Sequence, residues 1–220
     1  MVAVACGACA VLRPDAGAPD YAALHDRLAT AASERDAEAA TVRIRNLGCA
    51  ALSTGSGFVV GERELVTNAH VVAGAETLEI TTWDGHTFEA AVEGATLASD
   101  LARVRVDADL PPAARLAPSD PVPGDLLRVY GYPGGGALDV ETGQLVSYAE
   151  VDGRRSFVMS NKVRPGNSGG PVFGAGGEVV GVVRALLVDQ DQGVAIPAGE
   201  VAATLGSGAS GGVPGCDALG

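Results

Sequence analysis

The segment RPGNSGGP, residues 164–171, sets a serine among glycines and lies between two apolar stretches of the chain. Glycine has no Cβ atom, so a segment of this composition can turn tightly without steric clash. Such a turn exposes the hydroxyl of Ser168 and directs successive backbone N–H groups toward one point. A glycine-rich loop without function usually has polar flanks, whereas these apolar flanks predict a turn between two strands. Ser168 is therefore a candidate nucleophile.

Two earlier motifs supply the residues that a serine nucleophile needs. In LVTNAHVV, residues 65–72, an apolar strand ends at His70, and in ASDLA, residues 98–102, Asp100 precedes an alternating strand. A serine hydroxyl is a poor nucleophile near neutral pH, so a base must take its proton. His70 can be that base, while Asp100 accepts the other ring N–H and stabilises the imidazolium. The three motifs together predict nucleophilic acyl transfer.

The oxyanion formed in that reaction needs hydrogen-bond donors beside the nucleophile. We place the oxyanion hole at Gly166, Asn167 and Ser168, with the N–H groups of Gly166 and Ser168 as the donors. An esterase of the α/β-hydrolase type is disfavoured, because that fold carries a G-x-S-x-G turn and its histidine comes last in the chain. A catalytically silent domain that binds peptides in the same cleft is the alternative from another functional class.

Composition and charge restrict the class of protein. Of the 220 residues, 47% are hydrophobic and 19% are charged, and 31 glycines and 12 prolines are scattered without a period. This mixture excludes a disordered chain and a collagen, and it favours short strands joined by tight turns. The formal net charge of −12 repels phosphate backbones, so we expect no nucleic acid partner. No stretch reaches the ~18 to 20 apolar residues of a membrane helix.

The order of the elements predicts an all-β domain with one helix before it. An amphipathic helix is predicted over 20–40, and from Thr41 the period changes to the alternation of a strand. Regular short strands without helices between them indicate an antiparallel sandwich or barrels. Residues 110–125, which include five prolines, divide the strands into two groups. The later predicted strands are 56–60, 64–67, 77–82, 87–92, 101–107, 126–131, 142–149, 155–162, 171–173, 178–187 and 192–196.

The N-terminal residues and the four cysteines bear on the compartment. Residues 1–12 are wholly apolar, and we interpret them as the tail of a membrane or export segment whose start is missing. Cys6 and Cys9 form a C-x-x-C pair without the second pair or the βαβ context that metal or redox chemistry needs. Cys49 and Cys216 would close a loop of more than 160 residues if they pair, which requires an oxidising compartment. The alternative is two free thiols.

The order histidine, aspartate, serine resembles that of the chymotrypsin-like serine proteases. TNAHVV (67–72) and GNSGGP (166–171) resemble the histidine and serine boxes of the HtrA-type branch of those proteases. GSGFV (55–59) and GVAIP (193–197) are also similar to segments of that branch. With all four segments in order, the resemblance covers residues 41 to about 200.

A closer resemblance is to the actinobacterial acid-resistance periplasmic protease (MarP) family. The similarity lies in the helix and arginine-rich strand before the domain, in a cysteine well ahead of the histidine, and in a cysteine near the C-terminus. It implies a disulfide between Cys49 and Cys216, which ties the tail 206–220 back to the domain. It also implies a membrane anchor ahead of the apolar stub and linker 1–19.

The resemblance implies two six-stranded antiparallel β-barrels, 41–115 and 116–205, with the active site in the cleft between them. His70 and Asp100 come from the first barrel and Ser168 from the second. The implied activity is that of a monomeric serine endopeptidase that cleaves exported or envelope proteins, in stress response or protein processing. Its partners are polypeptide substrates, its location is extracytoplasmic, and the chemistry needs no metal ion and no cofactor.

The residue before the nucleophile departs from the trypsin pattern. Trypsin-type zymogens carry an aspartate there, which pairs with a newly cut N-terminal amine. Asn167 cannot form that ion pair, so we expect no activation by this ionic switch.

Substrate preference is predicted from the positions that line the specificity pocket in the resembling proteases. A trypsin-like pocket needs a carboxylate six positions before the nucleophile, and here that residue is Lys162, so basic P1 residues are disfavoured. Val163, Ala185 and Leu186 stand where HtrA-type pockets are lined, which favours a small or medium apolar P1 residue. The alternative is that Lys162 points inward and favours an acidic side chain.

Overall fold

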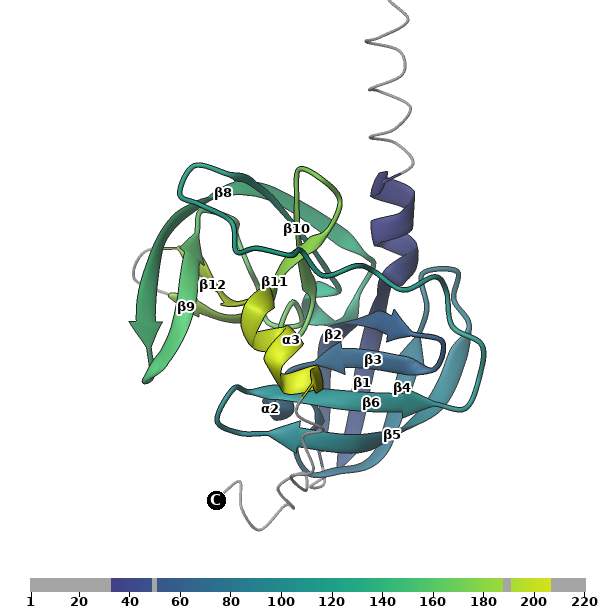
Figure 1. Cartoon of the computed structure of the whole chain (residues 1–220). Helices are drawn as coiled ribbons and strands as arrows, with labels where there is room; N and C mark the ends of the chain where they lie inside the picture. Colours follow the sequence, from purple (N-terminus) through teal and green to yellow (C-terminus); the bar gives the residue numbers. More distant parts are fainter. Residues whose placement is uncertain (1–32, 49–50, 188–190, 207–220) are drawn as a thin grey trace, which may run out of the picture. The chain divides into compact units, whose positions relative to one another are not determined.

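The first barrel is formed by the alternating segments between residues 41 and 106 (Figure 1). The computed structural model describes residues 33–48, 51–187 and 191–206. The strands of this barrel close in the order β1-β2-β3-β6-β5-β4, and every neighbouring pair is antiparallel. They are β1 (Thr41–Gly48), β2 (Ala51–Gly61), β3 (Glu64–Thr67), β4 (Ala75–Thr81), β5 (Thr87–Thr96) and β6 (Leu101–Val106).

The second barrel repeats the same plan with the order β10-β11-β12-β9-β8-β7, again antiparallel throughout. A short 3-10 turn, η1 (Pro133–Gly135), follows its first strand. The prediction of two six-stranded antiparallel barrels is confirmed. The strands are β7 (Leu126–Gly131), β8 (Asp139–Val151), β9 (Arg154–Met159), β10 (Pro171–Gly174), β11 (Val179–Leu187) and β12 (Gln192–Pro197).

Each barrel encloses an apolar core because its strands alternate between inward and outward side chains. In β1, Val42 and Ile44 are fully buried, whereas Arg43 and Arg45 are half-buried. Complete burial of one such aliphatic side chain contributes about 1.5 to 3 kcal/mol. The first core also contains Leu65, Ile80 and Val104, and the second contains Leu127, Phe157 and Val172.

A third apolar cluster joins the two barrels. It contains Phe58 and Leu101 from the first barrel and Tyr130 and Phe173 from the second. The rings of Tyr130 and Phe173 meet edge to face with their centres 5.3 Å apart, a geometry that aromatic pairs prefer. Because this cluster is buried, the two barrels are fixed against each other and can share one site.

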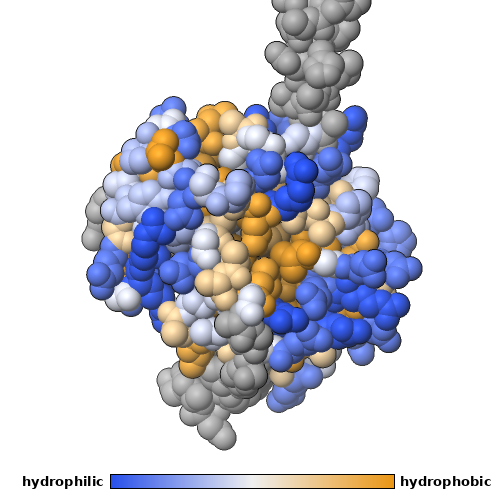
Figure 2. Space-filling model, in the orientation of Figure 1, coloured by the Kyte–Doolittle hydropathy of each residue, from blue (hydrophilic) through white to orange (hydrophobic). Residues whose placement is uncertain are grey.

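A helix absent from the prediction covers this junction. α3 (Ala198–Gly206) follows β12 directly and buries Val201 in the joining cluster. Figure 2 shows apolar residues gathered along the middle of this face, over the junction between the barrels, with hydrophilic surface on the flanks. The helix has only nine residues, too few for its periodicity to stand out from the strands before it.

The proline-rich segment 110–125 lies between β6, the last strand of the first barrel, and β7, the first strand of the second. The N–H of Ala114 donates to the carbonyl of Val59 in the first barrel, and the N–H of Ala117 donates to the carbonyl of Val179 in the second, both at 2.9 Å. β2 is longer than predicted, because its pairing with β1 extends back to Ala51.

Several predictions on the chain ends lie outside the described residues. Residues 33–40 are helical, while the remainder of the predicted helix 20–40, the apolar stub and all four cysteines fall outside them. The predicted disulfide between Cys49 and Cys216 therefore stays a prediction. None of the helices in the described ranges is long and apolar enough to cross a membrane.

Candidate active site

The ring of His70 is held by the carboxylate of Asp100. Nδ1 of the ring lies 2.9 Å from Oδ2 and 3.1 Å from Oδ1, and the backbone N–H of His70 donates to Oδ1 at 3.1 Å. The Asp100 side chain is 12% exposed and that of His70 is 49% exposed. Because an ionised carboxylate can only accept, we assign the ring proton to Nδ1. Nε2 is then an acceptor open to solvent, as a general base requires.

The backbone around Asp100 fixes this pair. Asp100 precedes β6 with a φ of 55°, a left-handed conformation that is uncommon outside glycine and often marks functional sites. Its carbonyl accepts hydrogen bonds from the N–H of Ala69 at 3.1 Å and from Nδ2 of Asn68 at 3.0 Å. These residues begin the short helix α2 (Ala69–Val72), which carries His70. At the other end of α2, buried Asn46 donates to two carbonyl groups at 3.0 and 2.9 Å.

The turn that carries Ser168 is held by Ser56, a fully buried residue of β2. The N–H of Ser56 donates to the carbonyl of Ser168 at 2.8 Å, and its Oγ donates to the carbonyl of Gly166 at 2.7 Å. The same Oγ accepts from the N–H of Tyr132 at 2.9 Å. Burial raises the pKa of Tyr132 to about 12, so its hydroxyl stays protonated. Ser56 thus fixes the carbonyls on both sides of Asn167.

Two glycines allow this turn to approach the helix that carries the histidine. A side chain at Gly55 would lie 2.5 Å from Cγ1 of Val71 and 3.2 Å from the carbonyl oxygen of Ser168. Gly169 has a φ of 83°, and a Cβ there would collide with the carbonyl oxygen of Ser56. Both positions therefore require glycine. Gly55 thus lies between Val71 of α2 and the backbone of half-buried Ser168, and the triad of Ser168, His70 and Asp100 stays a prediction.

Hydrogen bonding within the turn leaves two backbone donors unused. The N–H groups of Asn167, Gly169 and Gly170 each donate to a carbonyl oxygen at 2.8 to 2.9 Å. Within the part of the chain that the structure describes, the N–H groups of Gly166 and Ser168 have no acceptor. These are the two donors that the sequence analysis assigns to the oxyanion hole at Gly166, Asn167 and Ser168, and that assignment stays a prediction.

Asn167 stabilises the turn from within. Its N–H donates to the carbonyl of Arg164 at 2.9 Å, and its Oδ1 accepts from the N–H of Arg164 at 3.3 Å. The Asn167 side chain is buried. Contacts inside the turn therefore replace the ion pair that a trypsin-type aspartate would make.

The predicted specificity residues lie around the second core. Val163 is buried in that core, Leu186 packs against it and Ala185 is half-buried. Lys162 is different, because its side chain is 70% exposed and its Nζ lies 3.4 Å from Oδ2 of Asp191, itself largely exposed.

Three residues at the site carry no role in the sequence-based prediction: Ser56, Arg154 and Arg184. A signal existed for Arg184, since a lone charge in the apolar run VVGVVRALL (179–187) is unusual for a buried strand. Ser56 begins a predicted strand and lies in a segment that resembles the HtrA-type branch, but neither pattern indicates its contacts with the serine turn. Arg154 is one of several surface arginines, and nothing near it in the sequence distinguishes it.

Residues 55–182 match the family of trypsin-like peptidase domains. The chain belongs to this family. The chain is 32% identical over 182 residues to the serine protease Rv3671c of Mycobacterium tuberculosis, a match that covers 76% of this chain and 46% of that protein. It is 40% identical over 155 residues to HhoB of Synechocystis sp., covering 66% of this chain and 37% of HhoB. The chain thus spans less than half the length of these two relatives.

Solved structures give the same assignment. The active form of the Rv3671c protease matches this trypsin-like peptidase domain with a TM-score of 0.77 at 30% identity, over 94% of this chain and 99% of that chain. The inactive form matches with a TM-score of 0.71 at 30% identity, over 86% of this chain and 96% of that chain.

Replacing Ser56 by alanine is expected to destabilise the protein by about 1 to 3 kcal/mol. The change leaves the Gly166 carbonyl and the Tyr132 N–H buried without this partner, and an unsatisfied buried group costs free energy of that order. Urea unfolding measures the effect. Ser53→Ala, on an exposed position of the same strand, is the matched control and should change stability by less than about 0.5 kcal/mol. Equal effects of the two changes would contradict this account of Ser56.

Proposed function

We propose that this protein is a serine endopeptidase that uses Ser168, His70 and Asp100. The observation that carries the proposal is the hydrogen-bonded His70–Asp100 pair of the first barrel beside a turn of the second barrel. That turn presents Ser168 and two backbone N–H groups without acceptors among the described residues. The family and its serine protease relatives support the same activity.

The proposed reaction divides peptide hydrolysis into two acyl transfers. Oγ of Ser168 attacks the scissile carbonyl carbon while its proton moves to Nε2 of His70, and Asp100 stabilises the imidazolium. The N–H groups of Gly166 and Ser168 bind the oxyanion, a contribution of roughly 3 to 4 kcal/mol per donor. His70 then protonates the leaving amine. A water molecule, activated by the same base, releases the second product from the acyl-enzyme.

We place the enzyme outside the cytoplasm, acting on exported or envelope polypeptides as a monomer. Relatives named as DegP-like periplasmic serine endoproteases, such as that of Halomonas elongata at 35% identity over 136 residues, support the location. We further propose a role in stress response or protein processing, tethering through a preceding membrane segment, and a disulfide between Cys49 and Cys216.

For the P1 residue, we propose a preference for small or medium apolar side chains. Val163 and Leu186 supply apolar surface at the second core. Lys162 pairs with Asp191 in solvent, which argues against the alternative in which its ammonium group selects acidic residues.

A fluorophosphonate probe tests the nucleophile. The wild-type protein should be labelled on Ser168, and Ser168→Ala should remove both the label and peptide hydrolysis while the protein stays folded. Ser160→Ala, at an exposed serine of the same barrel, is the control and should label normally. A folded wild-type protein that takes no label would favour the silent peptide-binding domain.

The pH profile tests whether the site is pre-formed. Protonation of His70 removes the general base, so kcat/KM should fall about tenfold per pH unit on the acidic limb of the profile. Initial rates on a fluorogenic peptide, with structural integrity checked by circular dichroism at each pH, give the profile. A rate that rises below pH 6 would show that acid drives a conformational change outweighing the loss of base.

A peptide library randomised at P1 tests the pocket. Cleavage should be most efficient after apolar residues, and Lys162→Ala should leave that preference in place because the ammonium group faces solvent. Efficient cleavage after arginine would contradict the proposed pocket, and a preference for glutamate that Lys162→Ala abolishes would support the inward-facing alternative.

A further inference from the structure

A buried arginine of the second barrel lies against the carboxylate of Asp100. The Arg184 side chain is 5% exposed, and its Nε lies 4.0 Å from Oδ2 of Asp100. That oxygen is also the one closest to Nδ1 of His70. A guanidinium group stays protonated at any pH of interest. A permanent positive charge therefore faces the carboxylate that orients the proposed base, in a place where water screens it little.

The backbone of β11 is irregular at this residue. Val183 pairs with Ala195 and Ala185 pairs with Val194, so Arg184 stands in β11 without a residue opposite it in β12. A bulge of this kind bends the strand and redirects a side chain, and bulges are frequent next to active sites. Here the bulge lies at Arg184, within a run of apolar residues. The side chain of Arg184 reaches Asp100 in the first barrel.

Further contacts hold the guanidinium in place. Nη1 donates to the carbonyl of Val151 at 3.1 Å and to Oγ of Ser156 at 3.3 Å. Nη2 donates to Oδ2 of Asp152 at 2.6 Å. Asp152 lies in the turn between β8 and β9 and has a φ of 50°. Its carboxylate is 75% exposed, so water screens its charge more than that of Asp100.

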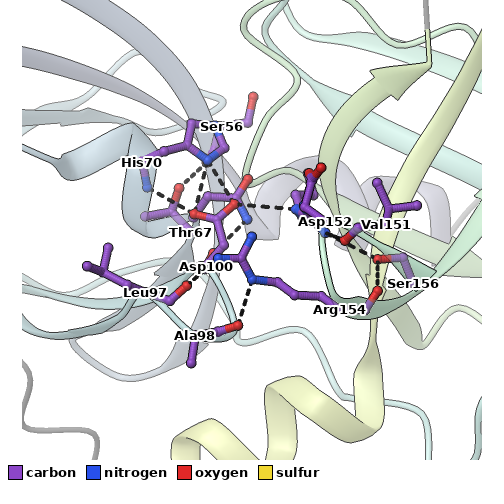
Figure 3. Close-up of polar contacts among 12 residues, drawn as sticks. Ser56, Thr67, His70, Leu97, Ala98, Asp100, Val151, Asp152, Arg154 and Ser156 are labelled. Atoms are coloured by element: carbon purple, nitrogen blue, oxygen red, sulfur yellow. Dashed lines mark hydrogen bonds and ion pairs between the residues drawn. The ribbon is translucent and has the colours of Figure 1, made fainter. Parts of the chain in front are cut away.

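Arg154, the first residue of β9, holds the segment that leads into Asp100. Figure 3 shows Arg154 reaching the carbonyl groups of Leu97 and Ala98. Its Nη2 donates to Leu97 and its Nε to Ala98, each at 2.7 Å. Two arginines of the second barrel thus reach the Asp100 segment, one at its backbone and one at its carboxylate.

We propose that Arg184 is a positioning residue that fixes the Asp100 carboxylate and offsets part of its charge, so that His70 stays neutral to lower pH. A cation near the Asp100–His70 pair opposes addition of a second positive charge to the ring. The charged groups facing the pair among the described residues are Arg184 and, through it, Asp152, while Arg154 faces backbone carbonyls. This inference rests on the proposed function, because it acts on the proposed base.

Arg184→Met tests the charge with little change in side-chain length. The acidic limb of the kcat/KM profile should move to higher pH by roughly half a unit or more, which is about a threefold loss of kcat/KM at a fixed pH on that limb. Arg184→Lys, which keeps the charge, should hold the midpoint closer to that of the wild type. A merely structural role would lower kcat/KM by one factor at every pH and leave the midpoint in place.

Asp152→Asn gives a second and opposite test, and its exposed position makes it safe for folding. Removing the carboxylate that neutralises Arg184 should move the midpoint of the acidic limb to lower pH. Asp107→Asn, which breaks an exposed ion pair with Arg63 on the outside of the first barrel, is the control and should leave the midpoint unchanged.

The outcomes separate this inference from the proposed function. If wild-type Ser168 takes the fluorophosphonate label but neither Arg184→Met nor Asp152→Asn moves the midpoint relative to Asp107→Asn, the role of Arg184 is overturned while the protease assignment stands. If Arg184→Met does not fold, Asp152→Asn is the remaining test. A midpoint of its acidic limb that is unchanged or shifted to higher pH overturns the role of Arg184 by itself. If the wild-type protein takes no label, the proposed function itself fails.

Discussion

The contact between Ser56 and the serine turn is the constraint on which the site depends. One buried residue of the first barrel uses its N–H and its hydroxyl on two carbonyls of the second barrel. The carbonyls that share a peptide plane with the N–H groups of Gly166 and Ser168 are those of Pro165 and Asn167, which accept from the N–H groups of Gly134 at 2.8 Å and Gly170 at 2.9 Å. The two donors without an acceptor among the described residues are thus held by these bonds together with the contacts of Ser56. A loop held this way requires no reorganisation during the reaction, which is the basis of electrostatic preorganisation.

The aspartate is constrained from both barrels as well. Asp100 occupies a left-handed backbone conformation and is bonded to α2 through its carbonyl and its carboxylate. The second barrel approaches it through Arg184 of β11 and Arg154 of β9. The interface between the barrels thus determines both the position and the electrostatic surroundings of the proposed base.

The sequence predicts what is local and leaves out what depends on packing between distant segments. The spacing of short strands is a local pattern that predicts an antiparallel sandwich or barrels, and the motifs around His70 and Ser168 carry the resemblance that implies two six-stranded barrels, which the structure confirms. The contacts of Ser56 and Arg184 join residues far apart in the chain, and no periodicity encodes such a meeting. α3 was missed because a nine-residue helix is recognised by what it buries, which the sequence alone does not reveal.

Because the residues of the proposed site come from both barrels, the site is complete only after both barrels have folded. A growing chain that has completed only its first barrel holds the imidazole and its carboxylate, but neither the alcohol nor the amides that would receive the negative charge. Contacts this distant along the chain form late and slowly. Proteolytic power would thus arrive only when the last strands close, so an incomplete polypeptide would have no means of digesting its neighbours or itself.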